Sequence, residues 1–193
     1  MKNVRTQGRS GVASKSAAAA APGARVAILM GSDSDWPVMA GASERLAALD
    51  VPHDVHVLSA HRAPEATGAF ARTARDAGYR VLICGAGVAA HLAGAVAAQT
   101  TLPVLGVPLD AGGLGGLDAL LATVQMPAGV PVGTLAVGRA GAENAGILAA
   151  QILAVGDERL AARLDQLKRT MLRGVEEKNR RIQEQRSRAK RPG

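Results

Sequence analysis

The feature that most constrains the fold is a regular alternation of short β-branched runs with alanine-rich stretches after residue 25. Buried strands are predicted at residues 26–30, 55–58, 81–84, 104–107 and 134–137. Helices are predicted between and after them, at 37–49, 64–77, 89–99, 117–124 and 141–154. Because such alternation is typical of right-handed βαβ crossovers, the sequence predicts an α/β fold with a five-stranded parallel sheet that is covered by helices on both faces.

The chain divides into four predicted segments. Residues 1–24 are predicted to be a disordered tail, 25–156 the α/β domain, 157–180 a further helix, and 181–193 a basic disordered tail. The apolar residues of the further helix form one narrow stripe, made of Leu160, Leu164, Leu167, Met171 and Val175. Because the opposite face of this helix is charged, the stripe needs the domain or a neighbouring subunit to lie against.

The core must be built from small side chains. Alanine and glycine are abundant, while Trp36, Phe70 and Tyr79 are the only aromatic residues. A core of this kind is thin for a monomer of 193 residues, so we expect the chain to form an oligomer.

The formal net charge of +7 comes from the two ends of the chain. Residues 1–24 carry four basic and no acidic residues, and residues 157–193 carry twelve basic and six acidic residues. The central segment 25–156 has seven basic and ten acidic residues, a net charge of −3. Since the chain also has almost no aromatic residues for base stacking, we do not expect a nucleic-acid partner.

Cysteine content and hydropathy exclude other classes of protein. Cys84 is the only cysteine, so neither an internal disulfide nor a cysteine-based metal cluster is possible, and a reducing cytoplasm is the expected compartment. No apolar run approaches the roughly 20 residues that span a bilayer, so no membrane association is expected. The four histidines lack recognisable metal-ligand spacing, and no Ser-His-Asp arrangement is visible.

Ligands of parallel sheets bind beyond the carboxyl ends of the strands, so the loops after the strands are the candidate sites. The first loop is Gly31-Ser32-Asp33-Ser34-Asp35-Trp36-Pro37. Its small and hydroxylated residues lead into a helix N-terminus, which could hold a phosphate through backbone N–H groups. The alternative is an ordinary helix N-cap with an Asx turn, which favours the same residue types.

The second loop is Ser59-Ala60-His61-Arg62-Ala63-Pro64. His61 and Arg62 would offer a proton carrier and a phosphate-binding guanidinium within one turn. The alternative for His61 is a solvated loop histidine with no role, which is also our interpretation of His53 and His56.

The third loop is Gly85-Ala86-Gly87-Val88-Ala89-Ala90-His91. Its glycines would allow a ligand to approach the backbone closely. A rival interpretation is a dinucleotide-binding fingerprint, Gly85-x-Gly87-x-x-Ala90, with Asp110 as the ribose-binding acid. This fingerprint usually opens the first βαβ unit of a domain, whereas here it would open the third.

Together these loops resemble the PurE family of purine biosynthesis, the N5-carboxyaminoimidazole ribonucleotide mutases. The first two loops match, as do Gly85-Ala86-Gly87 with Ala89-Ala90-His91-Leu92, Leu105-Gly106-Val107-Pro108, and the stretch from Val124-Gln125-Met126-Pro127 to Gly133. The likeness runs from about residue 25 to about residue 164. Trp36 after Ser34-Asp35 is more similar to the bacterial mutase class than to the animal-type carboxylase class.

The resemblance implies a fold, an assembly and a set of site residues. It implies a flavodoxin-like three-layer α/β/α sandwich with an extra C-terminal helix, a homo-octamer, and no metal or organic cofactor. Ser32 and Arg62 would bind the 5′-phosphate of a small-molecule ribonucleotide, and Asp35 the ribose hydroxyls. The remaining substrate-binding residues implied by the family motifs are Ser34, Ser59, Ala60, Gly85, Gly87, Ala89, His91 and Leu92.

The resemblance also implies a mechanism. The N-carboxyl group of the substrate would leave as CO2, stay in the pocket, and be attacked by C4 of the aminoimidazole ring. His61 would supply a proton in the first step and accept the C4 proton in the second, a double role that suits an imidazole. The backbone around Gly85 and Gly87 would enclose the CO2.

Three residues depart from the family pattern. Val88 stands where the family has a second glycine, and Ala93 and Ala95 stand where proline and methionine are usual. A valine is expected to forbid positive φ angles and to reshape the pocket. The alternatives are therefore a paralogue that acts on a related azole nucleotide, or a catalytically silent nucleotide-binding subunit.

Overall fold

The computed structural model describes Gly23 and residues 25–189, which form a five-stranded parallel sheet with strand order β2-β1-β3-β4-β5. The strands are β1 (Val26–Met30), β2 (His53–Val57), β3 (Val81–Gly87), β4 (Val104–Leu109) and β5 (Gly133–Thr134). The predicted five-stranded parallel sheet is therefore confirmed. The strand order reverses between β1 and β3, so the carboxyl ends of these two neighbouring strands flank a crevice.

Strand β5 is shorter than the predicted 134–137 because of Pro108 in its neighbour β4. The N–H of Leu135 still donates to the carbonyl of Gly106 at 2.9 Å. The next bond of a parallel ladder would need an N–H at residue 108, which proline lacks. The chain then follows β4 only through the N–H of Gly138, which donates to the carbonyl of Pro108 at 2.8 Å.

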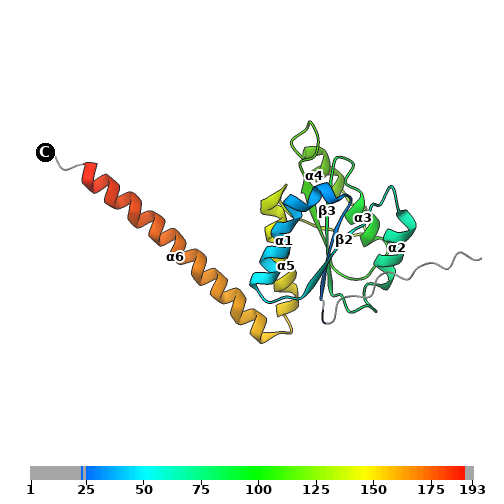
Figure 1. The fold of residues 1–193 in the computed structure, drawn as a ribbon, viewed down its shortest axis with the longest axis horizontal. Helices are drawn as coiled ribbons and strands as arrows, with labels where there is room; N and C mark the ends of the chain where they lie inside the picture. Colours follow the sequence, from blue (N-terminus) through cyan, green and yellow to red (C-terminus); the bar gives the residue numbers. More distant parts are fainter. Residues whose placement is uncertain (1–22, 24, 190–193) are drawn as a thin grey trace, which may run out of the picture.

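The helices are α1 (Trp36–Ala48), α2 (Pro64–Thr73), α3 (Leu92–Ala97), α4 (Leu117–Val124), α5 (Arg139–Ala154) and α6 (Glu158–Ala189). In Figure 1, α1 and α5 lie on one side of the sheet, and α2 and α3 lie on the other. Strand β1 is fully buried, and its alternate side chains enter two separate cores. Val26 and Ile28 pack with α1 and α5, whereas Ala27 and Leu29 pack with residues of α2 and α3. These are the three layers of the predicted flavodoxin-like sandwich.

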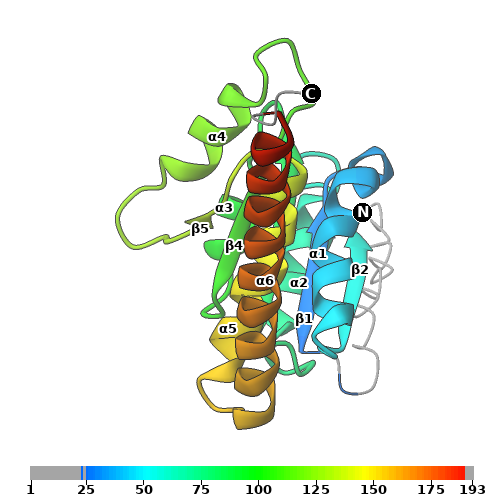
Figure 2. The same ribbon diagram turned by 90° about the vertical axis from the view of Figure 1, so that its left-hand side faces the viewer.

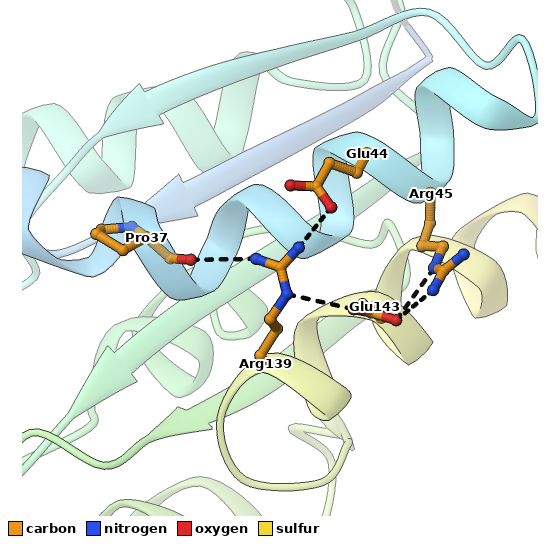
Figure 3. Close-up of polar contacts among 5 residues, drawn as sticks. All are labelled: Pro37, Glu44, Arg45, Arg139 and Glu143. Atoms are coloured by element: carbon orange, nitrogen blue, oxygen red, sulfur yellow. Dashed lines mark hydrogen bonds and ion pairs between the residues drawn. The ribbon is translucent and has the colours of Figure 1, made fainter.

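Helices α1 and α5 approach closely because glycines stand at their contact. A Cβ atom at Gly146 of α5 would lie 2.7 Å from the carbonyl oxygen of Ala42, and one at Gly41 of α1 would lie 3.0 Å from Cγ of Glu143. Along the same contact, Arg139 pairs with Glu44 and Glu143, and Glu143 also pairs with Arg45 (Figure 3). The guanidinium of Arg139 further donates to the carbonyl of Pro37 in the first turn of α1.

Helix α6 leaves the domain after its first turns (Figure 1), and in Figure 2 it lies in front of the domain. Leu160 is 1% exposed and packs in the core beside α5, whereas farther along the same stripe Val175 is 63% exposed. The helix continues to Ala189, beyond residue 180, where the sequence predicted its end. Glutamate, glutamine and arginine are strong helix formers, and Arg180 lies 4.0 Å from Glu184 one turn later, so the helix does not end there.

Some predictions concern residues outside the described part of the chain. The predicted N-terminal tail 1–24 lies there except for Gly23, as do residues 190–193. None of the described helices combines the length and apolarity that crossing a bilayer requires. Cys84 is fully buried in the middle of β3, and this burial raises the pKa of its thiol far above the ordinary value.

Candidate active site

A cavity of about 390 Å³ lies beyond the carboxyl ends of β1, β2 and β3, where the strand order reverses. It is lined by the loops after β1, β2 and β3 and by Ala111, two residues after the end of β4. The lining residues are Gly31, Ser32, Asp35, Ser59, Ala60, His61, Arg62, Ala86, Gly87, Ala89, Leu92 and Ala111. The structure therefore brings the three sequence-predicted loops together around one cavity.

The loop after β1 forms a capped 3-10 turn over Asp33–Asp35. The hydroxyl of Ser32 accepts a bond from the N–H of Ser34 at 3.3 Å, and the Asp35 carboxylate accepts one from the N–H of Ser32 at 3.1 Å. The N-cap interpretation is thus correct, and Ser32 lines the cavity as well. Ser34 is not among the lining residues, and its hydroxyl donates to Ser32 Oγ at 2.8 Å.

Asp35 is the acidic residue of the cavity wall. Burial raises the pKa of its carboxyl above the ordinary value, because the charged form loses contact with water. Hydrogen bonds from the backbone N–H groups of Ser32 and Gly31, and the nearby Arg62 guanidinium, oppose this rise. The net direction remains upward, so Asp35 accepts a proton at a higher pH than an exposed aspartate does.

Arg62 connects the loops after β1 and β2. Its guanidinium donates to the carbonyl of Gly31 at 2.8 Å and to the hydroxyl of Ser59 at 3.4 Å. The backbone N–H of Arg62 donates to the same hydroxyl at 3.1 Å. These bonds use only part of its donors, so the guanidinium is held at the cavity with further N–H groups available to an anion.

His61 lies against His91, which the sequence placed in another loop. The Nε2 atom of His61 is 2.7 Å from the Nδ1 atom of His91, and the rings meet edge to face. His91 itself is not among the lining residues of the cavity. The structure thus places His91 beside the catalytic candidate, and not in the cavity wall that the family motif suggests.

The two glycines of the third loop serve different purposes. A Cβ atom at Gly85 would lie 2.3 Å from the sulfur of Met39, so Gly85 makes room for helix α1 and does not line the cavity. Gly87 does line it, and a Cβ atom there would lie 2.5 Å from the Cβ atom of Ala111. Gly87 therefore lets the segment after β4 close against the turn after β3.

Val88 contradicts the expectation that a valine excludes positive φ angles. Its φ angle is 54°, in the left-handed region. The chain enters this conformation because it must turn sharply between β3 and α3. The N–H of Ala90 donates to the carbonyl of Val88 at 2.9 Å, and that of His91 to the carbonyl of Ala89 at 2.8 Å.

The dinucleotide interpretation finds no support in this geometry. Helix α3 begins at Leu92 and ends at Ala97, so the glycines do not open a long helix directly. Ala90 is buried, and Asp110 is not among the residues that line the cavity. In the described part of the chain, no group of three histidine, cysteine, aspartate or glutamate side chains is placed to hold a metal ion.

The interpretation of His53 and His56 as solvated loop histidines is wrong. His53 lies 2.7 Å from the hydroxyl of Ser43 through Nε2 and 2.9 Å from the carbonyl of Val51 through Nδ1. The ring of His56 packs on that of Phe70, and its Nε2 lies 3.3 Å from the hydroxyl of Tyr79. Burial lowers the pKa of His56. Both histidines are thus structural residues of β2, away from the cavity.

Sequence reasoning missed three residues of the cavity wall: Gly31, Ala86 and Ala111. Gly31 and Ala86 lie inside loops that were already singled out. Ala111 is the first residue after Asp110 in a glycine-rich stretch, and this richness was the available signal. A glycine-rich segment at the carboxyl end of a strand indicates close approach to a site.

Comparisons with known proteins agree with the resemblance carried by the loop motifs. Residues 25–173 match the family model of AIR carboxylase. The N5-carboxyaminoimidazole ribonucleotide mutase of Brucella melitensis is 54% identical over 153 residues, which cover 79% of this chain and 94% of that protein. The mutase of Escherichia coli K12 is 57% identical over 142 residues, which cover 74% and 84%. The crystal structure of Treponema denticola PurE matches with a TM-score of 0.66 at 24% identity, covering 86% of this chain and 98% of that one, and shows the shared fold.

Proposed function

The chain belongs to the AIR carboxylase family, and from this premise we propose that it is a mutase of purine biosynthesis, which converts N5-carboxyaminoimidazole ribonucleotide to 4-carboxy-5-aminoimidazole ribonucleotide. The names of the relatives that share more than half of their aligned residues support this assignment. The single observation that carries it is that His61, Ser32 and Gly87 line one cavity although they come from three separate loops.

In the proposed complex, Ser32 and Arg62 bind the 5′-phosphate of the ribonucleotide. The phosphate would replace water at the hydroxyl of Ser32 and at the N–H groups of Arg62 that remain available. Ser59 holds Arg62 in place through its hydroxyl, and Ser34 holds Ser32 in the same way. Asp35, beside this phosphate site, accepts hydrogen bonds from the ribose hydroxyls.

The proposed reaction exchanges one carboxyl group between two atoms of the same substrate. First, the bond between the exocyclic nitrogen and its carboxyl carbon breaks, and His61 gives a proton to that nitrogen as CO2 leaves. Then C4 of the ring forms a bond to the CO2 carbon, and His61 takes the C4 proton. The proton returns to its starting residue, so the reaction is an isomerisation that needs neither a metal nor an organic cofactor.

His91 assists His61 in this scheme. The 2.7 Å contact between the rings orients His61 and couples the tautomers of the two histidines, because one ring must donate and the other accept. Ala86, Gly87, Ala89, Leu92 and Ala111 supply an apolar part of the wall, where CO2 would be retained between the two steps.

Assay of N5-carboxyaminoimidazole ribonucleotide conversion with the wild type and His61→Asn tests the proposal. We expect roughly 10²- to 10⁴-fold slower turnover for His61→Asn, with binding retained, as for the loss of a general acid-base. The matched control is His53→Asn, a histidine substitution outside the cavity, which should keep turnover. Binding without turnover by the wild type would instead favour the silent nucleotide-binding subunit, and turnover of a different azole nucleotide would favour the paralogue.

We further propose that the chain works as a homo-oligomer, because the resemblance to the family implies a homo-octamer. We also propose that it works in the cytoplasm. The support for an oligomer is the apolar stripe of α6, which is buried at Leu160 but more than half exposed at Met171 and Val175, as is Ile182 farther along the helix. An isolated helix gains little stability in water without burial of such a face. Light scattering of the wild type and of Val175→Glu tests this, with a smaller assembly expected for the variant. A wild-type protein that is monomeric at assay concentrations would refute it.

A further inference from the structure

Val88 has a backbone conformation that β-branched residues rarely adopt. Among the described residues, only Asp50 and Val88 are non-glycine residues with positive φ, at 52° and 54°. Aspartate tolerates this region, but valine does not. Such strain persists only where the surrounding structure enforces it, and it gathers at functional sites.

The position of Val88 places this strain beside the cavity. Its neighbours Gly87 and Ala89 both line the cavity, although Val88 does not. The turn that contains Val88 ends at His91, and the ring of His91 contacts the ring of His61. A change in the conformation of Val88 therefore acts on the site only through its neighbours.

The side chain of Val88 faces the loop 110–116 that follows β4. A Cβ atom at Gly112 would lie 3.5 Å from Cγ2 of Val88, so the valine methyl group stands next to the space that a side chain at Gly112 would occupy. One residue earlier, Ala111 closes against Gly87. The turn after β3 and the loop 110–116 thus meet at two adjacent points, and one of them is made by the Val88 side chain.

Beyond Gly112, this loop makes few packing contacts with the rest of the protein. No atom lies within 4 Å of a Cβ position at Gly113 or Gly115, and Leu114 is 68% exposed. Gly116 anchors the far end, where a Cβ atom would lie 2.5 Å from a methyl group of Val137. Since glycine-rich backbone is intrinsically free to move, the packing at Ala111 and Gly112 determines how firmly Ala111, the residue of this loop that lines the cavity, is held in the cavity wall.

We propose that Val88 is a positioning residue that holds the loop 110–116 against the cavity and thereby limits the escape of CO2 during the reaction. This inference rests on the proposed function. CO2 is free from the moment its bond to nitrogen breaks until C4 binds it. If CO2 leaves in that interval, the proton from His61 stays on the nitrogen, and aminoimidazole ribonucleotide is released in place of the carboxylated product.

The partition between these two products tests the inference. The purified full-length protein is supplied with N5-carboxyaminoimidazole ribonucleotide, and both products are quantified while the uncatalysed decomposition is subtracted. For Val88→Gly, we expect the escaped fraction to rise roughly threefold or more, as for the loss of a lid contact, while total substrate consumption changes little. Val88→Asn accepts positive φ but keeps a side chain towards Gly112, so it should leak less than Val88→Gly.

Asp50→Gly is the matched control, since it removes the other positive-φ side chain at the end of α1, outside the cavity lining. It should leave the partition unchanged. An active Val88→Gly enzyme with the wild-type partition would overturn the inference and leave the proposed function standing. Equal leakage in Asp50→Gly would also overturn it, because a general loosening would then explain the effect. A wild type that makes no carboxylated product would instead refute the proposed function, and the inference with it.

Discussion

The Nε2 atom of His61 lies 2.7 Å from the Nδ1 atom of His91, across thirty positions of sequence. The two rings come from the loops after β2 and β3, so the pair connects these two loops beside the cavity. Two fully protonated imidazoles could not make this bond, because neither would offer a lone pair. The orientation of the proposed proton carrier thus depends on a residue outside the cavity lining.

Replacing His91 by phenylalanine should lower kcat with little change in KM. The aromatic ring is retained but the Nδ1 atom is lost, and the loss of one such bond corresponds to roughly a tenfold to hundredfold slower reaction. His91→Asn, whose amide group can reach the place of Nδ1, should recover part of the rate. Steady-state kinetics of the three proteins decide this. Equal losses in both variants would show that the contact does not orient His61.

Substrate affinity should fall on acidification earlier than an ordinary aspartate would predict. If the charged carboxylate of Asp35 binds the ribose, affinity is full above its pKa and is lost as the pH falls through it. Burial raises this pKa above the ordinary value of 3.8, so the loss begins at a higher pH. Titration calorimetry across the acid range measures it. Asp35→Asn should bind more weakly and lack this part of the pH profile, whereas an unchanged profile would argue against the role of Asp35.

Val88→Gly should be more stable than the wild type. A left-handed backbone destabilises the folded state by about 1–2 kcal/mol at a non-glycine residue, and the substitution by glycine removes this strain. Because glycine has more conformational freedom in the unfolded state, the substitution also destabilises the fold by about 0.5–1 kcal/mol. We therefore expect a gain of about 1 kcal/mol in the free energy of unfolding, measured by urea denaturation. Asp50→Gly should gain less, because aspartate tolerates the same φ. A loss of stability in Val88→Gly would mean that the contact with Gly112 outweighs the strain.

Two glycine-to-alanine substitutions should change stability in opposite directions. A Cβ atom at Gly141 would overlap the carbonyl of Ala136, and since backbone must then shift, Gly141→Ala should cost about 3 kcal/mol. Gly174 lies within α6 with no atom within 4 Å of its Cβ position. Gly174→Ala should therefore stabilise the protein by about 0.5–1 kcal/mol, as in any exposed helix. Thermal unfolding of both variants measures the difference, and similar effects would refute this account of Gly141.

Much of the fold could be predicted because local sequence and tertiary structure agree. The bounds of β1 and α4 match the predictions, since a glycine directly follows β1 and another directly precedes α4. Helix α3 begins at Leu92 rather than at residue 89, because the tight turns after Val88 use those residues first. The early end of β5 depends on Pro108 in another strand, so the sequence of β5 itself carries no sign of it.

The site was predictable where chemistry depends on residue type and place in a loop. Ser32, Asp35, His61 and Arg62 all follow predicted strands, and all four line the cavity. Gly85 was misplaced because a glycine beside a site and a glycine beside a helix look the same in sequence, and only the position of Met39 distinguishes them. The contact between His61 and His91 likewise depends on how the turn after β3 bends.

The burial of Cys84 has a practical consequence. The chain contains no other cysteine, and this thiol is enclosed by the core and stays protonated, so it should resist alkylation while the protein is folded. A cysteine introduced at the exposed Leu114 would then be the one position that accepts a fluorophore or spin label. Such a label would report any movement of the loop 110–116 directly, in real time, without removal of a native thiol.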